Sequence, residues 1–266
     1  NSFRANGNVV IKQGDSIELY SNSLDYDGNL RKIIAKGDVD FYNNKTNLKT
    51  EILFHDRNLN EIFFQDGGVI KDSVTTIKSI EGKYFLENSK YTFIKDVEIK
   101  NPDYEINSNA LDYLTKSEQA YFYGPTTIIG TDYEIYCEKG FYDTKNKKGY
   151  FIKNSQINYN NREIKGDSLT FNDLSQFASA SRNVKLTDTL NKTIIKGNYA
   201  EIFKALDSAM ITKRSLAIKM VDRDSLYIKA DTLFAIGPTE NRIIKGRYNV
   251  KFYKKNLSGR ADKIII

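Results

Sequence analysis

The chain has 266 residues, of which 40% are hydrophobic and 28% charged, so it is neither disordered nor embedded throughout in a membrane. Forty Lys and Arg against 34 Asp and Glu give a net charge of +6, and the basic residues are spread along the chain. A surface that binds nucleic acid usually gathers its basic residues, so no nucleic-acid partner is expected.

Cysteine and histidine each occur once, which limits the chemistry open to the chain. Cys137 has no partner for an intramolecular disulfide, and His55 has no second His or Cys with which to share a metal. A G-x-x-x-x-G-K-[ST] phosphate loop is absent. We therefore predict no catalytic residue, no metal site and no cofactor, and expect that the protein is not an enzyme.

The predicted elements are short β-strands along the whole chain. Tyr, Phe, Ile, Val and Thr favour pleated, half-buried surfaces, and alternation over a few residues is typical of a strand. Most of these stretches follow Gly, Asn or Asp, which suit tight corners. In chain order the clearest are residues 9–11, 39–41, 97–99, 157–159, 184–186 and 250–252. No apolar run is long enough to predict a transmembrane helix.

A degenerate motif returns about every 30 residues. It reads aliphatic, any, small, Asp/Asn/Glu, any, apolar, any, aromatic or aliphatic. The clear copies are Leu19 to Tyr26, Ile106 to Tyr113 and Ile164 to Phe171, and looser copies occupy 135–142, 195–202, 228–235 and 257–264. A fixed period of this size indicates one supersecondary unit stacked many times.

The motif contains a change of parity that predicts a bend. Ile164 and Gly166 share one face of a strand, whereas Leu169 and Phe171 lie an odd number of positions further on. If both pairs face the core, a bulge or sharp bend must absorb one residue near Asp167. Bends repeated at matching places fold a sheet into two walls around an apolar interior. We expect about three short strands per repeat and one elongated domain over residues 1–266, with two consecutive sub-blocks as the alternative, cut from a longer protein.

Several segments resemble one family. Residues 7–15 and 37–41 look like the G-(N/D)-V strand openings of the OstA/LptA-like proteins of lipopolysaccharide transport in Gram-negative bacteria. The segments that end in Leu24-Asp25-Tyr26 and Leu111-Asp112-Tyr113 resemble the next strand of that family, and residues 120–128 resemble its long members.

This resemblance implies an all-β fold, a twisted antiparallel β-jellyroll with the shape of a folded taco. It implies a periplasmic protein, with outer-membrane association as a further expectation, that shields the acyl chains of lipid A in its groove. The expected partners are lipopolysaccharide and other jellyroll proteins of the same pathway, which pair end to end through strands, with self-association as one form. Whether the chain is a bridge protein or part of an outer-membrane translocon stays open.

The parity of the motif predicts which side chains line the groove. The alternative for each of them is that it fills a closed core. The predicted lining residues are Leu24, Tyr26, Phe41, Leu111, Tyr113, Phe141, Leu169, Phe171 and Phe252.

Two other interpretations fit parts of the pattern. The recurrent Asp or Asn of the motif could form the internal ladder of a right-handed β-helix with a carbohydrate-active or surface-binding role. A structural surface array is the second, although the calcium-loop motifs common in such proteins are absent. Parallel or antiparallel strand pairing separates the β-helix from the folded sheet.

Overall fold

The computed structural model describes residues 2–266, and the chain forms two compact units, Asn1–Thr131 (unit 1) and Asp132–Ile266 (unit 2). Each unit is built from antiparallel β-strands, and the residues that the structure describes form no α-helix. The predicted all-β antiparallel jellyroll is therefore confirmed. The single domain expected from the sequence stays a prediction, and the two units are described one at a time.

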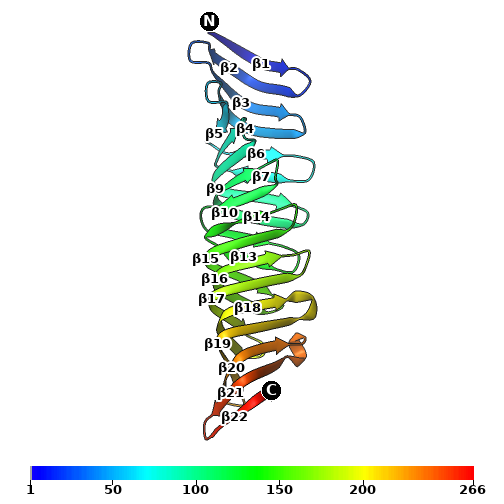
Figure 1. Ribbon diagram of the computed structural model, residues 1–266. Coiled ribbons are helices and arrows are strands. Elements are labelled where there is room, and N and C mark those ends of the chain that lie inside the picture. Colours follow the sequence, from blue (N-terminus) through cyan, green and yellow to red (C-terminus); the bar gives the residue numbers. More distant parts are fainter. Residues whose placement is uncertain (1) are drawn as a thin grey trace. The chain divides into compact units, whose positions relative to one another are not determined.

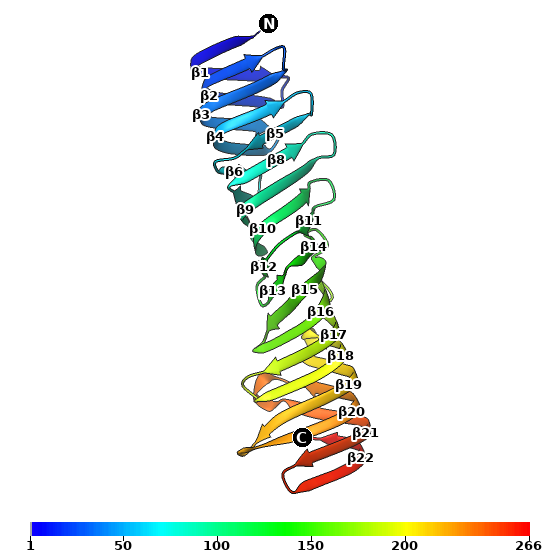
Figure 2. The ribbon, with the colours of Figure 1, turned by 90° about the vertical axis from the view of Figure 1, so that its left-hand side faces the viewer.

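Unit 1 is a meander in which long strands stack one above the next (Figures 1 and 2). Its strands are β1 (Phe3–Gln13), β2 (Ile17–Asp27), β3 (Lys32–Asn43), β4 (Thr46–Asp56), β5 (Glu61–Phe64), β6 (Gly68–Lys71), β7 (Thr76–Ser79), β8 (Glu81–Phe85), β9 (Lys90–Asn101), β10 (Tyr104–Leu114), β11 (Gln119–Phe122) and β12 (Thr126–Ile129).

Unit 2 continues the same construction with one more pair of short strands followed by long ones. Its strands are β13 (Glu134–Cys137), β14 (Lys139–Asp143), β15 (Lys148–Tyr159), β16 (Arg162–Asn172), β17 (Phe177–Asp188), β18 (Thr193–Phe203), β19 (Ser208–Val221), β20 (Asp224–Ile236), β21 (Ile243–Lys254) and β22 (Leu257–Ile265). Two 3₁₀ turns, η1 (Lys204–Leu206) and η2 (Thr239–Asn241), join its later strands.

Each long strand is creased near its middle, and the crease lies where the motif predicts it. In β16, Ile164, Gly166, Leu169 and Phe171 are all buried, so the burial pattern changes parity around Asp167. The register of β16 with β17 shifts between Lys165 and Ser168. The predicted crease is therefore confirmed in this strand.

The alternate strands make the crease with two consecutive residues of left-handed backbone. Gly37 (φ 77°) and Asp38 (φ 46°) do so in β3, and the register with β4 shifts at the same place. Glycine and asparagine or aspartate adopt this conformation at the lowest cost. Equivalent pairs occupy 7–8 in β1, 95–96 in β9, 153–154 in β15, 182–183 in β17, 213–214 in β19 and 248–249 in β21.

In other strands the crease is a complete break. The pairs β5 and β6, β7 and β8, β11 and β12, and β13 and β14 are the two halves of creased strands. Gly67 (φ 96°) lies in the first of these breaks. The Phe64 ring fills the interior beside that break, and a Cβ on Gly82 would come within 2.3 Å of it, so Gly82 leaves room for the ring.

One expectation from the sequence is wrong, and one alternative interpretation is excluded. The repeat is not three short strands but a hairpin of two strands of about 11 residues, because a crease leaves the strand continuous where a local pattern suggests an end. The β-helix is excluded for the described residues by their antiparallel pairing. The Asp and Asn of the motif are exposed at the crease rather than stacked inside, as Asn22, Asn109, Asp167, Asn198 and Asp231 show.

Candidate functional site

The interior of unit 1 is apolar and rich in aromatic rings. Tyr84 stacks on Tyr91 with ring centroids 4.4 Å apart, and Tyr91 stacks on Phe93 at 5.4 Å. A narrow pocket, open to solvent on one side, lies between these rings and the end of β3 with the start of β4. Its lining includes Phe41, Leu48, Ile62, Phe64, Ile70, Tyr84 and Tyr91.

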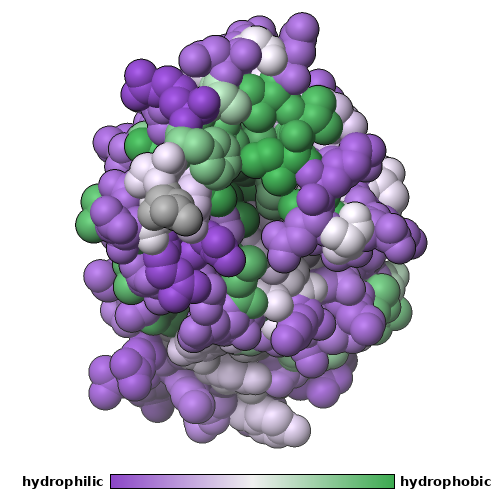
Figure 3. All heavy atoms as spheres, turned by 90° about the horizontal axis from the view of Figure 1, so that it is seen from above, coloured by the Kyte–Doolittle hydropathy of each residue, from purple (hydrophilic) through white to green (hydrophobic). Residues whose placement is uncertain are grey.

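The N-terminal end of unit 1 leaves this interior uncovered. Seen end-on, hydrophobic side chains gather in a hollow that hydrophilic residues surround (Figure 3). Phe3 of β1 packs against Tyr26 at 5.3 Å between centroids, and it remains 58% exposed. β1 pairs with β2 alone, so one of its edges has no neighbouring strand among residues 2–266.

Most of the predicted lining residues face the interior of their own unit. Leu24 and Leu111 in unit 1, and Leu169 and Phe171 in unit 2, are buried. The others on that face are half-buried: Tyr26, Phe41, Tyr113 and Phe252. The Phe252 ring lies over Gly259, where a Cβ would come within 2.4 Å of it.

Phe141 is the exception. It alternates with Gly140 and Tyr142 in β14, and Tyr142 is fully buried. Tyr142 lies opposite the buried Gly149, so Phe141 is on the outer face. The phase of the motif copy 135–142 also assigns Tyr142 to the interior, and the prediction for Phe141 was wrong by one position.

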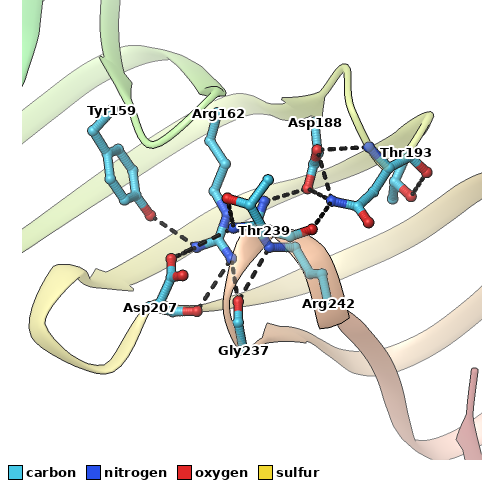
Figure 4. Close-up of polar contacts among 9 residues, drawn as sticks. Tyr159, Arg162, Asp188, Thr193, Asp207, Gly237, Thr239 and Arg242 are labelled. Carbon is cyan, nitrogen blue, oxygen red and sulfur yellow. Dashed lines mark hydrogen bonds and ion pairs between the residues drawn. The ribbon is translucent and has the colours of Figure 1, made fainter.

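Unit 2 contains a buried polar cluster that the sequence did not suggest (Figure 4). Arg162 and Asp188 lie at one end of the creased strands, whereas Asp207 and Arg242 lie at the other end. A straight strand of 11 residues such as β18 would hold its ends about 35 Å apart. The crease brings these ends together, and we call the line where the two rows of hairpin turns meet the mouth of unit 2.

Arg162 is held by groups from both sides of the mouth. Its Nη1 is 3.2 Å from Asp207 Oδ1 and donates a hydrogen bond of 3.2 Å to the Tyr159 hydroxyl. Its Nη2 donates to the carbonyl oxygens of Asp207 at 3.1 Å and of Gly237 at 3.4 Å. The Arg162 side chain has no exposed surface, and its Nε has no hydrogen-bond partner among the described residues.

Arg242 makes the second crossing. Its Nη1 pairs with Asp188 Oδ2, and both side chains are 1% exposed. Burial raises the pKa of Asp188, but hydrogen bonds from Asn191 and the Arg242 guanidinium outweigh it, so the net pKa is lowered. Asn191 also donates across the mouth to the Thr239 carbonyl at 3.0 Å.

A third ion pair crosses the mouth beside the first two. The Lys204 ammonium, on a side chain only 2% exposed, is 2.8 Å from Asp132 Oδ1. It also lies 5.0 Å from the centre of the Tyr133 ring, which in turn packs on Phe171 at 4.5 Å. Such a cation gains from the faces of aromatic rings when water is excluded.

Groups with catalytic potential are dispersed. Burial raises the pKa of Cys137 to about 12, and burial lowers the pKa of His55. Over residues 2–266 no three or more His, Cys, Asp or Glu side chains are arranged to hold a metal ion. The same residues contain no helix with the length and hydropathy needed to cross a bilayer.

Comparisons with known proteins found a family match and a similar solved structure. Residues 1–109 match the family described as OstA-like protein, so the resemblance seen in the sequence is confirmed over that segment. Among solved structures the chain is similar to LptH, the LptA-homologous periplasmic component of the lipopolysaccharide transport device of Pseudomonas aeruginosa. That similarity has 14% identity and a TM-score of 0.37, and covers 40% of this chain and 80% of LptH. A search of curated proteins found no match.

Proposed function

We propose that this protein carries lipopolysaccharide and shields the acyl chains of lipid A inside its creased sheet, in the periplasm and on the way to the outer membrane. The proposal is supported chiefly by the aromatic-lined interior of unit 1, which opens to solvent within the segment that matches the OstA-like family. No catalytic residue takes part, because the required step is shielding rather than bond making.

The magnitude of the hydrophobic effect explains what such an interior accomplishes. Each CH₂ group exposed to water costs about 0.8 kcal/mol, so a chain of about a dozen carbons resists crossing water by roughly 10 kcal/mol. An apolar interior removes most of this barrier. Binding much tighter than a membrane would trap the cargo, so net flow must be driven by a partner that consumes energy.

The lining residues are the candidates for contact with acyl chains. In unit 1 they are Leu24, Tyr26, Phe41, Leu111 and Tyr113, and in unit 2 they are Leu169, Phe171 and Phe252, with Tyr142 in place of Phe141. A photo-crosslinking residue at Leu24 or Leu111 should capture lipid A, whereas the same residue at the outward neighbours Asp25 and Asp112 should not. Equal capture on both faces contradicts the assignment.

A displacement assay tests affinity on the same face. Purified lipopolysaccharide should displace a fluorescent hydrophobic probe from the protein. Phe171→Asp places a carboxylate in the apolar interior and should weaken that displacement, whereas Thr170→Asp changes the exposed face of the same strand and serves as its control. Equal affinity of the two variants argues against binding in unit 2.

We further propose that the protein pairs end to end with other β-jellyroll proteins, including copies of itself. The uncovered edge of β1 and the apolar hollow beside it support this, since unpaired strand edges readily add a further strand. Sedimentation at increasing concentration should show larger species. A mass that stays monomeric at high concentration contradicts pairing between copies of this chain.

A further inference from the structure

We propose that the mouth of unit 2 is a gate, and that the ion cluster of Arg162, Asp188, Asp207 and Arg242 is the latch that holds it closed. This inference rests on the proposed function and adds to it. It states that acyl chains enter unit 2 sideways, between the two rows of hairpin turns, when the latch opens.

The first argument is the position of the latch. Arg162 and Asp207 are 45 residues apart in the sequence, and Arg242 and Asp188 are 54 apart. Each pair joins a turn at one end of the strands to a turn at the other end. Breaking both pairs leaves the two walls joined at the mouth mainly by the contacts of Asn191 with Thr239 and of Lys204 with Asp132. It leaves the hydrogen bonds between neighbouring strands intact, because those lie within each wall and do not cross the mouth.

The second argument is that charged rather than apolar side chains close the mouth. The walls behind the latch are apolar, with Ile164, Ile195 and Ile211 fully buried. Apolar side chains at the mouth could seal such walls at least as stably as buried ion pairs, which lose hydration on burial. Ion pairs at the mouth therefore hold the two walls in one defined arrangement. When they separate, they expose charged groups to water and not apolar side chains.

The third argument is that the closed network is incompletely satisfied. Arg162 Nε is buried and makes no hydrogen bond within residues 2–266. Asp207 Oδ1 has only ion-pair contacts, at 3.2 Å from Arg162 Nη1 and 3.5 Å from Arg242 Nη2. Two arginines against two aspartates leave the latch without net charge, and Asp207 is the most exposed of the four at 25%. Polar networks with unmet groups are less stable than complete ones, so this closure opens more readily than the sheet itself.

The interior of unit 1 provides the internal comparison. Its cavity already opens to solvent between the ends of β3 and β4 and those of β8 and β9. Ion pairs of unit 1 such as Lys83 with Glu61 and Lys32 with Asp56 join adjacent strands rather than opposite rows of turns. Unit 1 should therefore accept acyl chains without a gating step, whereas unit 2 should require one.

The test places a photo-crosslinking residue at Ile195, inside unit 2, and a second one at Leu24, inside unit 1, in separate proteins incubated with lipid A. Arg242→Met removes one half of the latch. Lys254→Met is the matched control. Lys254 pairs at 3.3 Å with Asp222 of a neighbouring turn in its own row, so this ion pair does not cross the mouth. Capture at Ile195 should rise several-fold in Arg242→Met and stay unchanged in Lys254→Met.

A locked protein tests the opposite direction. Asn191→Cys with Thr239→Cys, made in a Cys137→Ala background and joined by a short bifunctional thiol reagent, ties the mouth shut at an observed contact. Linking should reduce capture at Ile195 to background and leave capture at Leu24 unchanged. If Arg242→Met does not fold, Asp188→Asn weakens the same ion pair with almost no change of shape and should also raise capture.

The outcomes separate the gate from the proposed function. Suppose that Leu24 captures lipid A and that capture at Ile195 is equal in the native protein, in Arg242→Met and in the linked cysteine variant. This result overturns the proposed gate and leaves the proposed function standing. The same holds if Ile195 captures nothing in any of them. Loss of capture at both positions overturns the proposed function and the gate together.

Discussion

The crease makes a sharp prediction about two glycines that share one backbone conformation. Gly7 in β1 has φ 79° and Gly37 in β3 has φ 77°, and both begin the left-handed pair of their crease. Their surroundings differ. A Cβ on Gly37 would lie 2.6 Å from Asn22 Nδ2 and 2.9 Å from Asn22 Cβ, whereas a Cβ on Gly7 would meet no atom within 4 Å.

Alanine substitution therefore separates backbone strain from collision. Gly7→Ala should lower the free energy of unfolding by about 1–2 kcal/mol, the cost of a left-handed conformation for a residue with a Cβ. Gly37→Ala should add about 1–3 kcal/mol for overpacking, because Asn22 can rotate its amide but not its Cβ out of the way. The expected total for Gly37→Ala is thus about 2–5 kcal/mol.

Urea denaturation followed by circular dichroism measures both losses against the native protein. The double variant Gly37→Ala with Asn22→Gly removes the obstructing Cβ and should recover the collision part while retaining the strain. Equal losses for Gly7→Ala and Gly37→Ala, or a double variant no more stable than Gly37→Ala, would refute the view that the crease is a close contact between strands.

Four further predictions follow from the same structure. Arg242→Met should lower the free energy of unfolding by about 3–5 kcal/mol because it leaves Asp188 buried without its partner, and adding Asp188→Leu should restore most of the loss; denaturant titration decides, and no recovery contradicts it. Since the pKa of Asp188 is lowered on folding, its contribution is present above the unfolded value near 4 and lost as the pH falls below it, so acid should destabilise the native protein more than that double variant. Cys137, with its pKa raised to about 12, should resist thiol reagents at pH 8 until the protein unfolds; labelling at the rate of a free thiol contradicts its burial. If residues 1–266 form one domain, calorimetry should show one thermal transition, whereas two separate transitions indicate independent units.

The crease could be predicted because it leaves a local trace. A parity change within eight residues, next to a small residue and an Asp or Asn, predicts the bend in β16 from the sequence alone. The length of the strands has no comparable signal in the sequence. A crease and a strand end both interrupt alternation and both favour Gly and Asn, so 11-residue strands were expected as shorter ones. The error at Phe141 has a similar origin. Gly140 stands at the apolar position of its motif copy, so the alternation of inward and outward residues in this strand is not visible in the sequence.

The mouth of unit 2 could not be predicted, because its partners meet only after the sheet has folded. Arg162 follows a turn, Asp188 precedes one, and Arg242 comes after a 3₁₀ turn, so each is locally typical of an exposed loop. Nothing in the spacing of charges marks residues 45 to 75 positions apart as neighbours. The motif gives the period of the hairpins, about 30 residues, but the place of each turn within a period also depends on the length of the strands, which the sequence pattern does not resolve.

The crease, which the sequence predicts, and the mouth, which it does not, have a common physical basis. A creased strand exposes its Asp or Asn along the crease, which we call the spine, where Asn183 bonds Asp167 and Asn249 bonds Asp231. It also turns the apolar residues on both sides of the crease inward, as Ile164 and Leu169 do in β16. Two sets of polar contacts act on the bend itself, those at the spine and those across the mouth. Those at the spine link adjacent strands and fix the bend, so they must persist while the fold exists. Those at the mouth link distant strands and fix only the separation of the walls, so they are the contacts that can change without unfolding the sheet.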